Sequence, residues 1–232
     1  MSALSRAAMR DVLAGMGLFA ELARPDLETL AGLATERQAA RDALVIRRGD
    51  PGTSLMILVH GRLRVGAVSI DGRELTHGLL EAGAVLGEIA LLDGRARSAD
   101  VTAMQDSVLL VLERSVFLPF LLARPELMLR LMGVLCERLR RSSAAFEDVA
   151  LLPLPSRLAR LLLEMAEQHG KPVPEGTRIR LRLSQKELSA QVAATRERVN
   201  KQLRQWHEQG VLGDLEGDMV VRRPEALQAL IG

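Results

Sequence analysis

The chain has 232 residues, which is enough for one large or two ordinary domains. Of these residues 48% are hydrophobic, and the formal net charge is +2. No apolar run approaches the roughly 20 residues that span a bilayer, and the N-terminus holds no apolar signal core, so we expect a cytoplasmic protein that does not bind a membrane. The single cysteine, Cys136, excludes a disulfide framework and any cysteine-held zinc or iron–sulfur centre.

The first third of the chain changes from a helical to a strand-like pattern. Over residues 5–35, apolar residues recur at helical spacing and predict helices. Over residues 38–112 the pattern changes to short apolar runs, such as 54–59 and 62–68. Turn residues separate these runs, among them Gly49-Asp50-Pro51-Gly52, His60-Gly61 and Asp71-Gly72. Many short strands at this spacing predict an antiparallel sandwich or barrel.

The segment 87–98 connects two predicted strands and contains two glycines. It combines a carboxylate, Glu88, with a guanidinium, Arg97, nine positions later. A carboxylate accepts hydrogen bonds from a hydroxyl, and Arg offers a fixed fork of donors to phosphate oxygens. The apolar run 89–92 predicts one helical turn whose free N–H groups also face an anion. On these residues alone, a surface loop with solvated charges remains an equal alternative.

A long helix is predicted after Pro125. Its apolar seam has spacings of 4, 4, 3, 4 and 3 and consists of Leu131, Leu135, Leu139, Ser142, Phe146 and Val149. Such a stripe with charged flanks favours contact with a partner helix, and packing against the chain's own sheet is the alternative. Pro153 and Pro155 then end the helix and mark a hinge.

The C-terminal part is basic: residues 152–232 hold 13 Lys/Arg against 10 Asp/Glu, whereas the rest holds 18 against 19. This asymmetry indicates a polyanionic partner, provided that the basic residues share one face.

Two helices are predicted in this C-terminal part. Ser184 and Glu187 form a capping-box pattern that opens a helix through Val192, and Thr195 caps the next helix after a short break.

The second of these helices has two different faces. Val199, Leu203 and Trp206 form its buried stripe, and the opposite face carries Arg196, Glu197, Asn200, Lys201 and Arg204. These polar groups suit phosphates and base edges, and an acid among them suits a cytosine amino group. Pairing of the acid with Lys201 at i, i+4 is the alternative. A hairpin of 211–212 and 219–221 follows, so we expect a winged helix-turn-helix.

Together these motifs resemble the Crp/Fnr superfamily of bacterial transcription regulators, close to the cyclic-AMP receptor branch, over nearly the full length. The resemblance implies an α+β fold. It would consist of an N-terminal cyclic-nucleotide-binding antiparallel β-roll or sandwich (1–123), a long dimerisation helix (124–152) and a C-terminal winged helix-turn-helix (153–232). It also implies a homodimer through the long helix, double-stranded DNA as a partner and a contact with RNA polymerase.

The resemblance implies roles for single residues. Glu88 would bind the ribose 2′-hydroxyl, Arg97 and Ser98 the cyclic phosphate, and Gly87 and Ile89 would offer backbone groups. On the long helix, Arg138 falls where an arginine of the family contacts the glutamate of the segment 87–98, which we call the cassette. Ser142 and Ser143 fall where a hydroxyl pair reaches the purine, and a seam serine with no ligand role is the alternative.

The family's base-reading positions fall on Arg196, Glu197 and Lys201, which implies a palindrome of TGTGA-like half-sites. The other expected DNA-binding residues are Ser184, Lys186, Thr195, Asn200 and Arg204. Ala193 stands where the family has a turn glycine, so that turn must avoid a left-handed residue or accept strain.

Four functional alternatives follow. The resemblance to the family favours cyclic AMP as the allosteric effector. Cyclic GMP comes next, because seryl hydroxyls both donate and accept and therefore serve either purine. A haem sensor would have to use His60, His77, His169 or His207, and an effector-free, constitutive regulator is also possible. We expect no metal. We also expect no enzyme activity, since no catalytic triad, metal cluster or Walker motif has useful spacing.

Overall fold

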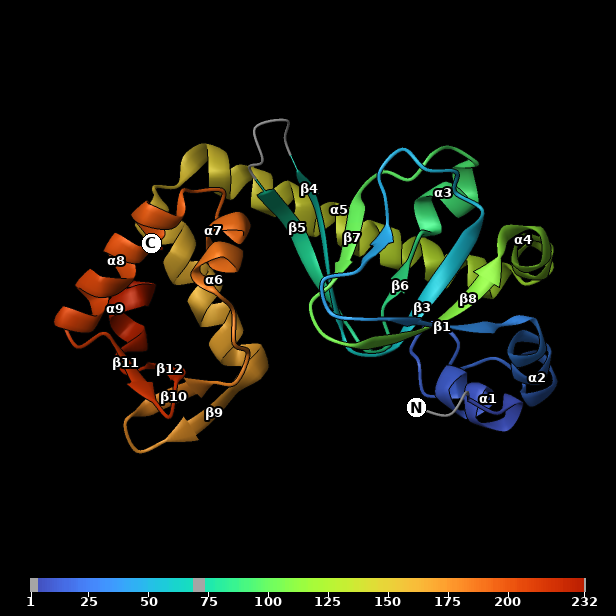
Figure 1. Ribbon diagram of the computed structural model, residues 1–232, viewed down its shortest axis with the longest axis horizontal. Coiled ribbons are helices and arrows are strands. Elements are labelled where there is room, and N and C mark those ends of the chain that lie inside the picture. The colour runs from blue at the N-terminus through green and yellow to red at the C-terminus, as the bar shows by residue number, and fades with distance from the viewer. Residues whose placement is uncertain (1–3, 69–73, 232) are drawn as a thin grey trace. The chain divides into compact units, whose positions relative to one another are not determined.

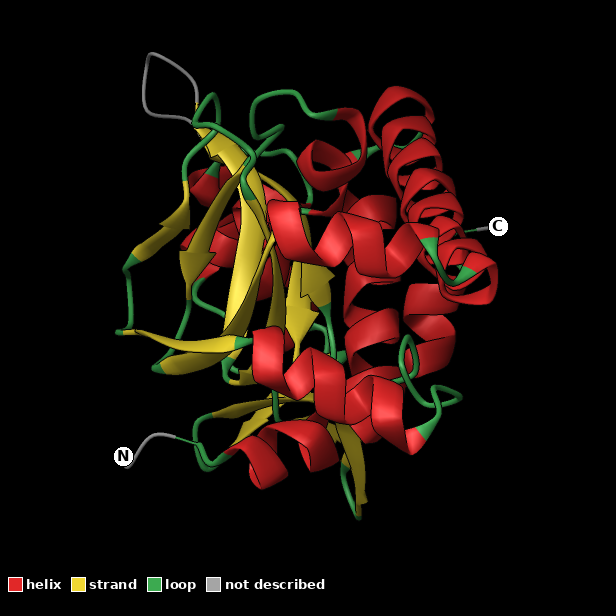
Figure 2. Cartoon of the chain, turned by 90° about the vertical axis from the view of Figure 1, so that its right-hand side faces the viewer, coloured by secondary structure: helices red, strands yellow, loops and turns green. Residues whose placement is uncertain are grey.

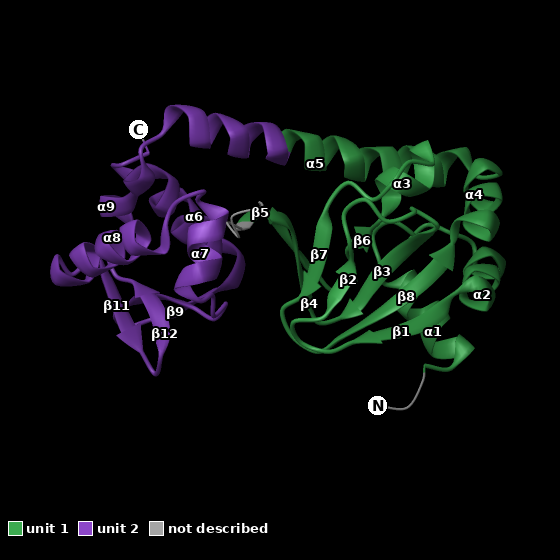
Figure 3. Cartoon of the chain, turned by 45° about the horizontal axis from the view of Figure 1, so that its top comes forward, with its two compact units in different colours: residues 1–140 green, residues 141–232 purple. Residues whose placement is uncertain are grey.

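The computed structural model describes residues 4–68 and 74–231, so the expected turn at Asp71-Gly72 lies outside the described residues. The chain divides into two compact units, residues 1–140 and 141–232 (Figure 3). The boundary falls inside one helix, and the division into 1–123, 124–152 and 153–232 stays a prediction.

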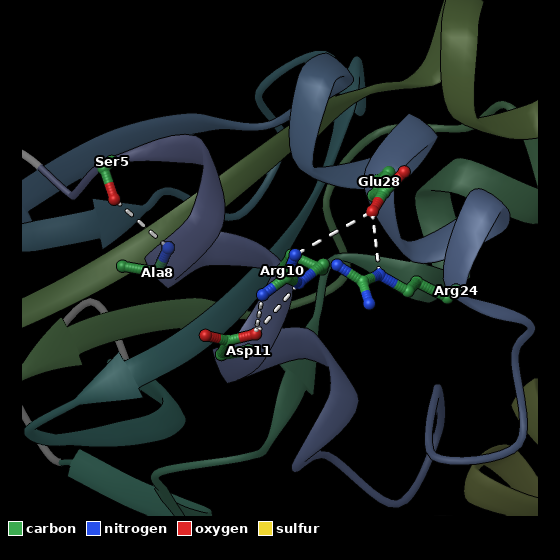
Figure 4. Close-up of polar contacts among 6 residues, drawn as sticks. All are labelled: Ser5, Ala8, Arg10, Asp11, Arg24 and Glu28. Carbon is green, nitrogen blue, oxygen red and sulfur yellow. Dashed lines mark hydrogen bonds and ion pairs between the residues drawn. The ribbon is translucent and has the colours of Figure 1, made fainter.

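Two short helices open the chain, as the helical spacing predicted: α1 (Arg6–Ala14) and α2 (Arg24–Leu33). The Ser5 side chain caps α1 by accepting a hydrogen bond from the Ala8 N–H, which satisfies one free donor of the first turn. Arg10 pairs with Asp11 at 2.6 Å and reaches Glu28 of α2 at 3.8 Å (Figure 4). The Arg10–Glu28 pair links the two helices, and solvent-exposed pairs of this kind contribute little to stability.

Among the described residues, the first unit holds two four-stranded antiparallel sheets (Figure 1). One has the order β1-β8-β3-β6 and consists of β1 (Thr35–Ala39), β8 (Ser107–Glu113), β3 (Ser54–His60) and β6 (Val85–Leu86). The other has the order β2-β7-β4-β5 and consists of β2 (Leu44–Ile46), β7 (Asp100–Ala103), β4 (Arg62–Val68) and β5 (Glu74–Glu81). The predicted antiparallel sandwich is therefore confirmed.

Strand β3 is buried on both faces, which explains its unbroken apolar run. Leu55 and Ile57 pack with the helices, whereas Met56 and Leu58 pack in the cluster that joins the two sheets. Successive side chains of a strand point to opposite faces, so a strand covered on both sides shows no polar alternation. Each fully buried Leu or Ile contributes roughly 1.5–3 kcal/mol.

Three helices complete the first unit and lead out of it: α3 (Glu88–Asp93), α4 (Arg114–Leu122) and α5 (Pro125–Leu151). Figure 3 shows α4 and the N-terminal half of α5 along one side of the strands. The 27 residues of α5 match the long helix expected after Pro125, and at 1.5 Å per residue they extend about 40 Å.

The apolar residues of α5 divide between two faces. Leu131, which the spacing placed on the seam, is fully buried in the core of the first unit. Met132 takes its place on an exposed stripe with Leu139 and Phe146, at exposed fractions of 51%, 69% and 75%. These three positions are seven residues apart, so they lie on one face of the helix.

The second unit, described over residues 141–231, is built from helices around a four-stranded sheet of order β11-β12-β10-β9. The strands are β9 (Gly170–Val173), β10 (Gly176–Ile179), β11 (Leu212–Leu215) and β12 (Asp218–Val221). The helices are α6 (Leu154–His169), α7 (Gln185–Gln191), α8 (Arg196–Glu208) and α9 (Pro224–Gln228). Figure 1 labels these elements, and Figure 2 shows the helices of the chain in red and its strands in yellow. The expected C-terminal hairpin, β11–β12, is thus extended by two earlier strands. Among the described helices, none is both long and apolar enough to cross a membrane.

Candidate functional site

Gly87 turns the chain from β6 into α3. It is left-handed, with φ +81°, and caps the helix without a side-chain hydrogen bond. A Cβ atom at this position would overlap Nη1 of Arg97 and come within 2.9 Å of the Ser54 carbonyl oxygen. Only glycine therefore satisfies both the backbone conformation and the close approach of the guanidinium.

Arg97 is buried, with 6% of its surface exposed. Its Nη1 donates to the Gly87 carbonyl at 3.2 Å, and its Nη2 donates to the Ser54 hydroxyl at 3.0 Å. Burial lowers the pKa of the guanidinium, while the nearby Glu88, Glu113 and Asp50 carboxylates oppose that shift. A buried guanidinium is costly unless its donors are satisfied, so this arrangement holds a cation ready for an anion.

Glu88 is even more deeply buried, at 2% exposure, and begins α3. Its Oε1 accepts a hydrogen bond from Nη1 of Arg138, and Nη2 of the same arginine donates to the Val85 carbonyl. The expected contact between Arg138 and Glu88 is thus present in the structure. It ties α5 to the turn that carries the cassette.

The other expected ligand-binding side chains are exposed and, among the described residues, make no hydrogen bond to this cluster. Ile89 is 42% exposed, and Ser98 is exposed at the end of the cassette. Ser142 and Ser143 are also exposed, four and five residues after Arg138 along α5. Because residues three and four apart share a helix face, Ser142 follows Arg138 on the same side of α5.

Sequence reasoning missed Ser54. Its hydroxyl, in a residue only 5% exposed, accepts the Nη2 hydrogen bond of Arg97 from 43 residues away. The available signal was a polar residue at the head of the apolar run 54–59, where a buried hydroxyl requires a partner. Nothing in that run indicates which partner it has.

The second candidate surface lies on α7 and α8, and both predicted caps are present. Ser184 and Glu187 form the reciprocal capping box, and Thr195 accepts a hydrogen bond from the Arg198 N–H. The turn between the helices does contain a left-handed residue, because Ala193 has φ +48°. Of the two possibilities for this turn, the chain therefore adopts the strained left-handed residue at Ala193.

Most of the expected DNA-binding side chains are solvent-exposed: Ser184, Lys186, Thr195, Arg196, Glu197, Lys201 and Arg204. Within the described part of the chain, Glu197 and Lys201 make no ion pair with each other or with another residue. The alternative of intrahelical pairing is therefore not what the structure adopts.

Asn200 differs from its neighbours on α8. It is half-buried, and its Oδ1 atom is buried without a hydrogen-bond partner among the described residues. It lines a cavity of the second unit rather than the exposed face.

Two family models match the chain. The model described as "Cyclic nucleotide-binding domain" matches residues 36–124, and the one described as "Crp-like helix-turn-helix domain" matches residues 156–230. The first therefore covers the cassette, and the second covers α7, α8 and the hairpin.

Similar full-length proteins include the CRP-like cAMP-activated global transcriptional regulator of Mycobacterium tuberculosis, 28% identical over 92% of this chain and 95% of the relative. The cyclic AMP receptor protein of Thermus thermophilus is 27% identical over 93% and 97%. Among solved structures, a CRP-family transcriptional regulator of Thermus thermophilus has a TM-score of 0.70 at 26% identity, over 84% of this chain and 96% of that one.

Proposed function

The chain belongs to the Crp/Fnr superfamily and is a Crp-like transcription regulator with a cyclic-nucleotide-binding domain, and on that premise we propose that it is a homodimer that cyclic AMP switches to binding palindromic, TGTGA-like DNA. The observation that carries this proposal is the pair of buried residues Arg97 and Glu88 at the head of α3, with the half-buried Arg138 bonded to Glu88. It combines a cation for a phosphate with an acceptor for a hydroxyl.

Arg97 retains the donors that a cyclic phosphate needs. A guanidinium has five N–H donors, and the bonds to Gly87 and Ser54 use two of them. The remaining donors can bind two phosphate oxygens in the bidentate manner that distinguishes arginine from lysine. Free N–H groups in the first turn of α3 support the same anion.

Glu88 retains an acceptor for the ribose. Only its Oε1 is engaged by Arg138 among the described residues, which leaves Oε2 for a hydroxyl. Arg138 fixes the direction of the carboxylate and supplies a cation beside it, since a buried carboxylate without a cation would be costly. Gly87 and Ile89 would then contribute backbone groups, and Ser98 a hydroxyl to the phosphate.

Ser142 and Ser143 are proposed to contact the purine from α5. Their hydroxyls donate and accept, so they serve the exocyclic group of adenine or guanine. Cyclic AMP is proposed first because the similar regulators of Mycobacterium tuberculosis and Thermus thermophilus are named for it, and cyclic GMP second.

The exposed stripe of α5 supports the homodimer. Met132, Leu139 and Phe146 recur every seven residues and are all more than half exposed in a single chain. A partner copy of α5 would cover this stripe as in a parallel coiled coil. A dimer would also present two α8 helices to DNA, with half-sites one helical turn, about 34 Å, apart.

On α8, we assign base reading to Arg196, Glu197 and Lys201, and phosphate contacts to the caps and Arg204. The acid suits the cytosine amino group, and its lack of an ion pair among the described residues leaves it available for that contact. The protein would act in the cytoplasm and contact RNA polymerase. Cyclic AMP would favour DNA binding only by binding the DNA-competent arrangement more tightly.

A regulator that binds DNA without an effector is the second candidate. It is favoured by one observation: Arg97 and Glu88 are already hydrogen-bonded within the chain.

A gel shift separates the two. A duplex with two TGTGA half-sites is titrated with the protein alone, with cyclic AMP and with cyclic GMP, beside a control duplex in which both half-sites are scrambled. Retardation of the specific duplex only with nucleotide supports gating. Equal retardation with and without nucleotide supports the effector-free regulator, and equal affinity for both duplexes would count against sequence reading.

A further inference from the structure

The second unit contains a cavity of about 500 Å³ behind the face of α8 that we assign to DNA. Helices α6, α7 and α8 form its walls together with the segment 179–185 and the turn of the β11–β12 hairpin. This volume falls in the range of small-molecule sites, which run from about 300 to 1,000 Å³. All of its lining residues belong to the one compact unit.

The inner wall of the cavity is apolar. Its apolar side chains come from α6, α7, α8 and the segment 179–185: Leu162, Met165, Ile179, Leu181, Leu188 and Leu203. These side chains are buried within the unit, whereas Arg182, Arg204 and Asp214 on the other side are exposed, so the cavity is a half-open cleft with an apolar inner wall. A ligand that covers this inner wall gains dispersion contacts and removes apolar area from water.

Two polar atoms of α8 in this wall lack hydrogen bonds. Oδ1 of Asn200 and Nε2 of His207 are both buried, and neither has a hydrogen-bond partner among the described residues. Nε2 lies 3.2 Å from an Asp214 oxygen, and the other ring nitrogen of His207 is engaged with the Leu203 carbonyl at 2.8 Å. A buried acceptor without a donor is costly, and native structures have few of them.

The charges around the cavity are balanced or lie at its edge. Asp218 accepts hydrogen bonds from both Arg178 and Arg182, which hold the pKa of its carboxyl below the usual range. Arg204 and Asp214 are exposed and carry opposite charges. The interior therefore offers apolar area and an unmet acceptor but, among the described residues, no unpaired buried charge, which disfavours an ionic ligand.

We infer that this cavity binds a small uncharged molecule with an aromatic or aliphatic body and a hydroxyl or N–H donor, which the Oδ1 of Asn200 accepts. The cavity shares α8 with the DNA-reading face, so its occupant adjusts the affinity for DNA. That second step rests on the proposed function, whereas binding to the cavity does not.

The test uses the full-length protein and two matched probes, 2-naphthol and naphthalene, which differ only in the hydroxyl. Calorimetry without DNA or cyclic nucleotide should give saturable one-to-one binding of 2-naphthol, at about fivefold or higher affinity than naphthalene. Asn200→Leu should abolish that preference, and Gln205→Leu, at an exposed position of the same helix outside the cavity, should retain it. Asn200→Ala, which adds no bulk, should repeat the loss if Asn200→Leu does not fold.

Absence of saturable binding, or an unchanged preference in both Asn200 variants, would overturn the site. The DNA arm is separate: saturating 2-naphthol should change the affinity for a TGTGA-type palindrome by about threefold or more. Binding without any change in DNA affinity would overturn the coupling, while failure to bind DNA at all would contradict only the proposed function.

Discussion

The cassette and helix α8 hold similar charged side chains, which are buried in the cassette and exposed on α8. Arg97 and Glu88 are 6% and 2% exposed, and each is hydrogen-bonded within the chain. Arg196, Glu197 and Lys201 of α8 are exposed, and Glu197 and Lys201 make no ion pair with a described residue. The chain therefore fixes the first set through its own hydrogen bonds and leaves the second set exposed to solvent.

Under the proposed function, the difference follows from the size of the two ligands. A nucleotide is small, so its site gains affinity from buried, preorganised donors whose cost is met during folding. DNA is a long polyanion, and exposed cations bind it by releasing counterions without prior desolvation. If this contrast is right, substitutions in the cassette should act through single hydrogen bonds, and those on α8 through base preference and salt dependence.

The largest effect is expected at Arg97. Arg97→Gln removes the charge and leaves the phosphate without its bidentate partner, so affinity for cyclic AMP should fall about 30-fold or more. Arg95→Gln, two residues away and exposed, should change the affinity less than about twofold. Calorimetry measures both. Equal losses in the two variants would mean that Arg97 has no special role.

The next largest effect is expected for a substitution in α5. Leu139→Glu places a charge in the exposed stripe of α5, so the dimer should dissociate and affinity for a palindrome should fall about 100-fold. Leu122→Glu, at a similar exposure of 64% on α4, serves as the control. Analytical ultracentrifugation gives the mass, and a Leu139→Glu variant that stays dimeric refutes the assignment of the stripe.

On the DNA side, Glu197→Ala should lose about tenfold in affinity for the TGTGA palindrome, because a base-reading contact disappears. Its affinity for scrambled DNA should not fall, since the variant has lost a negative charge. Glu208→Ala removes an exposed acid from the end of the same helix and should leave discrimination intact. Fluorescence anisotropy compares the two duplexes, and unchanged discrimination in Glu197→Ala is the contrary result.

A smaller effect is expected at Ser54, which we regard as a positioning residue for Arg97. Ser54→Ala removes the hydroxyl that fixes Nη2, so cyclic AMP affinity should fall about three- to tenfold without loss of folding. Thr53→Ala changes the adjacent, exposed hydroxyl and is the matched control. An affinity unaltered by Ser54→Ala would show that Arg97 needs no such support.

The smallest expected effect is a pH dependence of the stability of the second unit. Hydrogen bonds from Arg182 and Arg178 lower the pKa of Asp218, so its contribution to stability is full at neutral pH and is lost as the pH falls through that lowered pKa, below about pH 4. Trp206, the sole tryptophan, is buried in the second unit and reports its unfolding by fluorescence. Between pH 6 and pH 3 the urea midpoint should fall more in the wild type than in Asp218→Asn, and equal falls would contradict this.

The sequence predicts most reliably what is local. The caps at Ser184 and Thr195 and the turn of helix after Gly87 are confirmed, because each depends on residues within three or four positions. The unbroken run of β3 indicated a strand, although only the fold explains why it is covered on both faces.

Contacts between residues that are far apart in the sequence could not be predicted from local patterns. Periodicity alone did not decide whether Leu131 or Met132 belongs to the seam, since the rotation of α5 is set by its packing on the first unit. Ser54 was missed because its partner is 43 residues away, and Asn200 faces a cavity that only the packing of α6 and the hairpin creates. The ligand and DNA roles of the candidate residues remain predictions.

The central claim is that nucleotide and DNA binding are coupled. Cyclic AMP is titrated by calorimetry into the free protein and into the protein saturated with the TGTGA palindrome. Linkage requires that DNA raise the affinity for the nucleotide by the same factor by which the nucleotide raises the affinity for DNA. We expect binding at least tenfold tighter in the DNA complex, and equal affinity in the two titrations would contradict the account.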